Sequence, residues 1–148
     1  MTLPPLTPAG DLPTGVHRAS ATEVIERFGT VSQMRRLVGM RLERILALLA
    51  GTGQVARAII FGSFVSDKPS PNDVDLFLVM EDSFDLTAVS GEARLLFDHA
   101  VAQSHFGASI FWVRRLACFP SEEEMVAGWA LKRDGTSRGI VELEKEAT

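Results

Sequence analysis

The sequence lacks the features that mark secreted proteins, membrane proteins and cysteine-based metal proteins. Its single cysteine, Cys118, excludes an internal disulfide and a zinc cluster built on cysteines. No apolar run approaches the roughly 20 residues that a membrane-spanning helix needs. The proline-rich start holds no basic segment followed by an apolar one, so a signal peptide is not predicted. We therefore expect a cytoplasmic protein without a membrane partner.

An excess of positive charge is also missing. The formal net charge is −4 at pH 7 and the isoelectric point is about 5.4, which argues against broad binding to DNA or RNA. The net charge does not exclude a local basic patch. With 46% hydrophobic residues, the 148-residue chain can bury a core of its own. We expect a proline-rich arm over residues 1–15 and a single domain over residues 16–148.

Predicted strands alternate with predicted helices along the chain. Capping residues and apolar periodicity predict helices over residues 22–28, 32–50, 92–104 and 121–129. Short apolar runs, several rich in β-branched residues, predict strands over residues 55–61, 74–80, 108–113 and 139–143. This order is typical of an α/β (α+β) fold, in which helices flank a mixed β-sheet.

The longest predicted helix, residues 32–50, has an apolar stripe that only Arg41 interrupts. We expect Arg35, Arg36 and Arg44 on its polar side. They form either a solvated helix face or a basic stripe for a partner or RNA.

The stretch from residue 55 to residue 80 carries the candidate chemistry. Gly62-Ser63 ends one predicted strand, and Asp73-Val74-Asp75 begins the next after nine intervening residues. A glycine allows a phosphate to approach closely, and the serine adds a hydroxyl donor. The two aspartates are two residues apart, so they share one strand face and suit a divalent cation such as Mg²⁺. The stretch predicts metal-assisted phosphoryl or nucleotidyl transfer.

This pattern resembles the signature of the nucleotidyltransferase superfamily that shares the DNA polymerase β fold. The similarity covers about residues 32–113. Weaker motifs resemble an uncharacterised group of small bacterial proteins related to minimal nucleotidyltransferases, some of which are antitoxins in toxin–antitoxin pairs. Those motifs lie at residues 15–18, 62–65, 68, 71, 73–75, 134–135 and 138–141.

The resemblance implies a polymerase β-like fold, a nucleoside triphosphate as substrate and Mg²⁺ as cofactor. It implies that Asp73 and Asp75 bind the metal and are catalytic, and that Gly62 and Ser63 bind the phosphates. Lys68 is either a further phosphate contact or a solvated loop lysine. Other basic candidates for phosphate contact are Arg114, Arg115, Lys132, Arg133 and Arg138.

One departure from the superfamily concerns a third acid, which active members usually carry on a later strand. The strand expected to supply it, residues 108–113, has none, and Ala108 or Ser109 stands about where the acid is expected. A serine does not replace a carboxylate as a base near neutral pH. Acids elsewhere in the chain are alternatives among which the sequence does not choose: Glu81, Asp82, Asp98 and Glu142.

Two functions therefore remain open. The first is Mg²⁺-dependent transfer of a nucleotide to a protein or RNA hydroxyl. The second is a binding module of the same fold with weakened or lost chemistry, which docks to a partner such as a cognate toxin. The sequence does not predict the oligomeric state. We expect His17 to anchor the proline-rich arm, and Trp112 and Trp129 to lie in the core.

Overall fold

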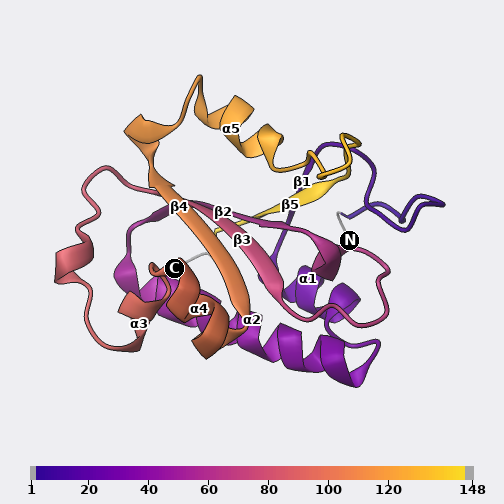
Figure 1. Cartoon of the computed structure of the whole chain (residues 1–148), viewed down its shortest axis with the longest axis horizontal. Coiled ribbons are helices and arrows are strands. Elements are labelled where there is room, and N and C mark those ends of the chain that lie inside the picture. The colour runs from indigo at the N-terminus through magenta and orange to yellow at the C-terminus, as the bar shows by residue number, and fades with distance from the viewer. Residues whose placement is uncertain (1–2, 146–148) are drawn as a thin grey trace.

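In a computed structural model that describes residues 3–145, these residues form one five-stranded mixed sheet with helices on both faces (Figure 1). The strand order is β1-β5-β2-β3-β4. β1 and β5 run parallel, β3 and β4 run parallel, and β2 is antiparallel to both of its neighbours. The strands are β1 Val16–Ala19, β2 Val55–Phe61, β3 Val74–Met80, β4 Ala108–Arg114 and β5 Ile140–Leu143. The predicted α/β (α+β) class with a mixed sheet is confirmed.

The helices begin mostly at the predicted capping residues. The side chains of Ser20, Ser32 and Ser121 each accept the backbone N–H three residues further on, which satisfies a donor that the helix leaves free. The helices are α1 Ala21–Phe28, α2 Gln33–Thr52, α3 Glu92–Leu95, α4 His99–Phe106 and α5 Glu122–Gly128. Within residues 3–145, no helix is both long and apolar enough to cross a membrane.

The single helix predicted over residues 92–104 is wrong, because the structure has two short helices there. Asp98 leaves the helical conformation, with φ −110° and ψ 111°, and its carboxylate accepts the N–H of Val101 at 3.2 Å. Asp98 is therefore the cap of α4 rather than an interior residue. Strand β1 was not predicted at all, since its four residues alternate without a buried apolar run.

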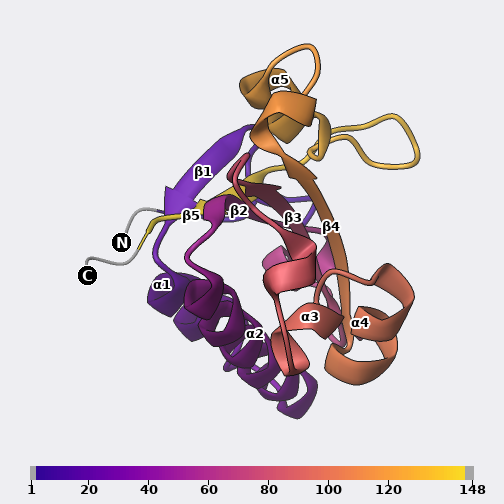
Figure 2. The same ribbon diagram turned by 90° about the vertical axis from the view of Figure 1, so that its left-hand side faces the viewer.

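The two faces of the sheet carry two groups of buried apolar side chains. The larger group lies between the sheet and α1, α2, α3 and α4, and it includes Leu76 and Leu78 of β3. Figure 2 shows α1 and α2 beneath the sheet and α5 above it. The smaller group, beneath α5, includes Phe77 and Val79. Because side chains alternate along a strand, Asp75 shares the α5 face with Phe77.

The proline-rich arm lies against the domain. Leu3 and Leu12 are buried, and the carbonyl of Leu12 accepts the N–H of Gly139 at 2.9 Å. A nitrogen of the His17 ring lies 2.6 Å from the carbonyl oxygen of Pro13. The anchoring role predicted for His17 is confirmed by this contact.

Helix α2 turns most of its predicted apolar stripe to the core. Val38, Leu42, Ile45 and Leu49 of the stripe are buried, whereas Leu37 is exposed. Arg35 belongs to the buried side and is only 4% exposed, so its expected place on the polar side is wrong. Arg36 and Arg44 are exposed, as predicted.

Candidate functional site

The glycine of the Gly-Ser turn has a conformation that other residues avoid. Gly62 follows β2 with φ 84° and ψ −165°, a region that is essentially restricted to glycine. A Cβ atom built on Gly62 would overlap Oδ2 of Asp75. The glycine therefore permits both the backbone turn and the close approach of this carboxylate.

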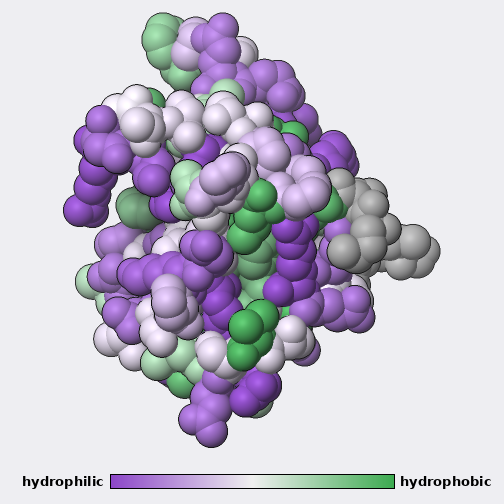
Figure 3. Space-filling view, turned by 90° about the vertical axis from the view of Figure 1, so that its right-hand side faces the viewer, coloured by the Kyte–Doolittle hydropathy of each residue, from purple (hydrophilic) through white to green (hydrophobic). Residues whose placement is uncertain are grey.

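The serine of the same turn presents a free hydroxyl. Ser63 begins a single 3₁₀ turn, Ser63–Val65, and its carbonyl oxygen accepts the Ser66 hydroxyl at 2.6 Å. The Ser63 hydroxyl itself forms no hydrogen bond with any of the described residues and is partly exposed. This hydroxyl is therefore available to a ligand. Figure 3 views the side of the molecule where the arm and the segment 62–73 lie. The surface there is largely hydrophilic around a narrow apolar strip.

Buried Arg35 holds the backbone of this turn in place. Its guanidinium donates to the carbonyl oxygens of Phe64 at 2.7 Å, Ser66 at 2.7 Å and Lys68 at 2.6 Å. Burial lowers the pKa of Arg35 from its ordinary value, and the charge of Asp67 opposes that change. An arginine stays charged under such conditions, so these are charge-assisted hydrogen bonds.

Sequence reasoning missed this role of Arg35, although a signal was present. Arg35 precedes Val38, Leu42, Ile45 and Leu49 at alternating steps of three and four residues. It therefore continues the buried stripe of α2 by one turn.

The two aspartates lie where the prediction placed them, at the start of β3. Asp73 directly precedes the strand, Asp75 is its second residue, and both are half-buried. The pKa of Asp75 is raised to about 6, chiefly by burial and also by the charge of Asp73, while a hydrogen bond with Ser109 opposes the rise. The charge of Asp73 thus disfavours the charged form of Asp75, and an added cation would relieve this repulsion.

Ser109 takes the position beside Asp75 in the sheet. In the parallel pairing of β3 with β4, Asp75 is opposite Ser109, whereas Ala108 is opposite Val74 and points to the other face. Ser109 is 8% exposed, and its hydroxyl accepts a hydrogen bond from the amide of Gln103 at 3.0 Å. The residue beside Asp75 on β4 is therefore Ser109, whose hydroxyl is hydrogen-bonded to the amide of Gln103.

The alternative acids are engaged elsewhere. Glu142 pairs with Arg57 at 2.7 Å, and Glu81 lies 3.3 Å from Arg115. Asp82 accepts the backbone N–H of Leu116, and Asp98 caps α4. Across residues 3–145, no group of three or more His, Cys, Asp or Glu side chains is placed to hold a metal ion.

Two basic side chains act electrostatically on Asp75. The charges of Arg138 and Lys68 both lower the pKa of this carboxyl group. Lys68 is exposed, and Arg138 also lies 3.6 Å from Asp11 of the arm.

Among the described residues, the other predicted basic residues show no contact with Asp73 or Asp75. Arg114 lies over the rings of Phe84 and Trp112. Arg115 pairs with Glu122 at 2.8 Å. Lys132 lies 3.6 Å from Asp11, and Arg133 is exposed.

This donor set is chemically suited to Mg²⁺ that arrives with a nucleotide. Mg²⁺ prefers one or two carboxylates together with water and phosphate oxygens to a cage built entirely from protein. Asp73 and Asp75 would supply the carboxylates, and the missing side chain of Gly62 lets the backbone turn lie directly against Asp75. Lys68 and Arg138 add positive charge at the same place.

Comparison with known proteins relates nearly the whole chain to one family. The model of that family, described as a family of unknown function (DUF6932), matches residues 4–144. Searches of curated proteins and of solved structures found no match. The match includes the arm, the Gly-Ser turn, both aspartates and Ser109. The chain therefore belongs to the family of unknown function DUF6932.

Proposed function

We propose that this protein binds a nucleoside triphosphate with Mg²⁺ and transfers its nucleotide to a hydroxyl group of a protein or RNA. The observation that carries the proposal is the fit between Gly62 and Asp75. A residue in a glycine-only conformation lies directly against a half-buried carboxylate, next to a second carboxylate and two basic side chains. The resemblance to polymerase β-like nucleotidyltransferases supports the same reading, and we place the reaction in the cytoplasm.

Each residue of the site has a role in this proposal. Asp73 and Asp75 hold Mg²⁺, which neutralises phosphate charge when it is bound. The Ser63 hydroxyl donates to a phosphate oxygen, and Lys68 and Arg138 balance the remaining charge. Arg35 fixes the turn before the substrate arrives, so binding costs little rearrangement.

The reaction forms a bond between the α-phosphorus of the triphosphate and the acceptor oxygen. It breaks the bond from the α-phosphorus to the oxygen that bridges to the β-phosphorus and releases pyrophosphate, and the acceptor proton passes to solvent water. A general base that removes the acceptor proton typically contributes about 10²–10⁴-fold to the rate. Ser109 stands beside Asp75 where such a carboxylate is expected, and it supplies no base. We therefore expect slow transfer with binding intact.

A second candidate function rests on the same residue. With Ser109 in place of an acid, the fold serves as a binding module with weakened or lost chemistry. Its partner would be a protein such as a cognate toxin. This alternative differs from the first proposal because the protein acts by docking and forms no product.

The first experiment measures nucleotide binding by calorimetry. Mg²⁺ with ATP or GTP is titrated into the wild type and into the double variant Asp73→Ala, Asp75→Ala. The double variant Glu43→Ala, Glu124→Ala removes two exposed carboxylates and changes the net charge equally. We expect binding to be lost only in the aspartate variant. If the wild type binds no triphosphate, nucleotide transfer is wrong and only the binding module remains.

The second experiment follows a labelled nucleotide into cell extract proteins and RNA. Incorporation that depends on Asp73 and Asp75 supports transfer. Binding without incorporation into any acceptor favours the binding module.

A further inference from the structure

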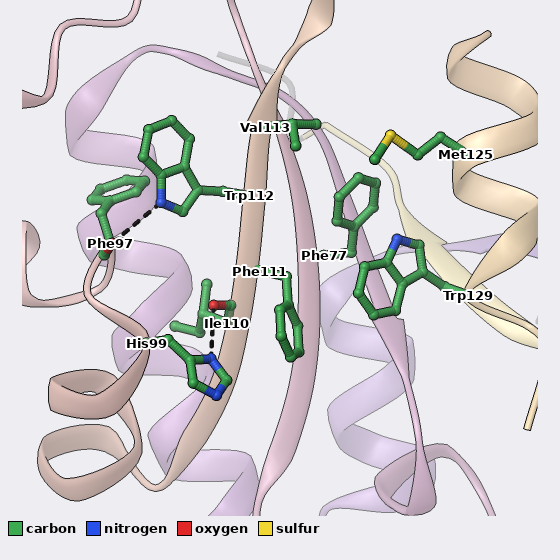
Figure 4. Close-up of a pocket in the computed structure, with 9 residues that line it drawn as sticks. All are labelled: Phe77, Phe97, His99, Ile110, Phe111, Trp112, Val113, Met125 and Trp129. Carbon is green, nitrogen blue, oxygen red and sulfur yellow. Dashed lines mark hydrogen bonds between the residues drawn. The ribbon is translucent and has the colours of Figure 1, made fainter. Parts of the chain in front are cut away.

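We infer that the aromatic groove beside Asp75 binds the base of the nucleotide, an inference that rests on the proposed function. The aromatic groove is defined by Phe61, Phe77, Phe111 and Trp129. It opens into a hollow of about 350 Å³ that extends around the edge strand β4. Phe77, Phe111 and Trp129 line the hollow on the α5 face, and Phe97 and Trp112 line it on the other side of the strand (Figure 4).

The groove is continuous with the carboxylates. Phe77 follows Asp75 by two residues on β3, and Phe111 follows Ser109 by two residues on β4, so all four side chains share one face. Two residues of a strand span about 7 Å. A ribose bridges a gap of this order between an α-phosphate and a base. Phe61, which pairs with Asp75 across β2 and β3, joins the groove to the glycine turn.

The rings form one connected surface. The Trp129 ring lies 4.7 Å from Phe61, 5.0 Å from Phe77 and 5.1 Å from Phe111, measured between centroids. On its other side Phe111 contacts the ring of His99 at 4.7 Å. Phe111 is 37% exposed, which leaves an open aromatic surface at the sheet edge. Figure 4 shows Phe111 between His99 and Trp129.

The chemistry of the lining favours a flat, uncharged ligand. His99 is the one ionisable side chain among the residues that line the hollow, which otherwise are aromatic or aliphatic. The indole N–H of Trp112 donates to the carbonyl of Phe97 at 3.2 Å. The indole N–H of Trp129 has no acceptor among the described residues, so it can donate to a base nitrogen or carbonyl. A nucleobase combines the required π-face with such acceptors.

The test compares two ligands that share their phosphates. Wild type, Phe111→Ala and Phe119→Ala are titrated with Mg²⁺–ATP and with Mg²⁺–tripolyphosphate, which lacks a base. Phe119 is 83% exposed and lies outside the groove, so its variant is the matched control. Stacking of a base on one aromatic ring changes affinity by about tenfold. We expect Phe111→Ala to lose about tenfold for ATP and nothing for tripolyphosphate, with Phe119→Ala unchanged.

A fluorescence measurement gives a second readout. In Trp112→Phe, Trp129 is the only tryptophan left, and we expect ATP but not tripolyphosphate to quench its emission. If tripolyphosphate binds as tightly as ATP, the aromatic groove does not bind the base, and the proposed function is unaffected. Equal ATP affinity in Phe111→Ala and wild type would lead to the same conclusion. If neither ligand binds the wild type, the proposed function and the groove are both wrong.

Discussion

The guanidinium of Arg35 donates a 2.6 Å hydrogen bond to the carbonyl oxygen of Lys68, which lies 33 residues further along the chain. The same group also holds the carbonyls of Phe64 and Ser66. The segment after Gly62 is therefore fixed to α2 and not only to the strands on either side. A side chain distant in the sequence from the candidate phosphate site thus sets the shape of that site.

Arg35→Ala is expected to lower the free energy of unfolding by about 3 kcal/mol or more, because several buried carbonyls lose their donor. Arg35→Lys should recover only part of this loss, since one ammonium does not match the planar guanidinium. Urea denaturation measures both changes. The control is Arg36→Ala, an exposed neighbour that donates to Thr30. An equal loss in the control would contradict the role assigned to Arg35.

Gly62→Ala is expected to destabilise the protein by about 1–3 kcal/mol, because alanine would be strained at this backbone conformation. The added methyl group would also displace the Asp75 carboxylate, so nucleotide affinity should fall further than stability alone explains. Gly51→Ala is the matched control. It lies in α2 with open space around it, and it should be neutral or slightly stabilising. Thermal unfolding and calorimetry separate the two effects.

Asp75→Asn is expected to stabilise the metal-free protein at neutral pH. The pKa of Asp75 is about 6 in the folded protein against an ordinary value of 3.8, so folding disfavours its charged form. The stability that protonated Asp75 contributes is full below pH 3.8 and is lost as the pH rises through about 6.

The variant should therefore gain about 1–2 kcal/mol at pH 7.5, after allowance for screening by water, and nothing near pH 3.5. Chemical denaturation at both pH values measures this difference. Asp85→Asn is the control, because hydrogen bonds from Thr87 hold the pKa of exposed Asp85 below its ordinary value. If Asp85→Asn gains stability at neutral pH and Asp75→Asn does not, the raised pKa assigned to Asp75 is wrong.

Ser109→Asp tests the missing acid directly. A carboxylate placed beside Asp75 should lower the melting temperature without metal, through repulsion, and Mg²⁺ should raise it more than in the wild type. If transfer is the function, the variant should also form product faster, by up to about 10²-fold. Ser104→Asp, an exposed position on α4, controls for added charge. The proposal fails if Mg²⁺ affects the two variants equally.

The sequence predicts structure correctly where the pattern involves residues that are close together in the chain. The bounds of β2 and β3 were predicted as the structure has them, because a short apolar run between turn residues leaves few alternatives. Gly62, Asp73 and Asp75 could be placed relative to each other because they lie at the adjoining ends of these two paired strands. The prediction that Ser109 lies beside Asp75 was only approximate. Strands β3 and β4 are parallel and are separated in the chain by helices, so no local pattern fixes which residues pair.

The remaining features depend on contacts between distant residues. Arg35 contacts carbonyls that follow Gly62, and periodicity alone does not say which partner a buried charge meets. Trp129 was expected in the core, yet it is only half-buried and connects three phenylalanine rings. Asp98 caps a helix because its backbone turns there, a choice that tertiary packing makes.

The place of β5 in the sheet has a consequence for how the protein is made. β5 lies between β1 and β2, so Val16 pairs with Ile140 rather than with any strand near it in the chain. Of the five strands among residues 3–145, β5 is the last to leave the ribosome. Until then β1 has no hydrogen-bonding partner, and closing so long a loop costs chain entropy. We therefore expect β2 and β3, with the Gly62–Asp75 pair, to form during synthesis before β5 joins β1 to the sheet.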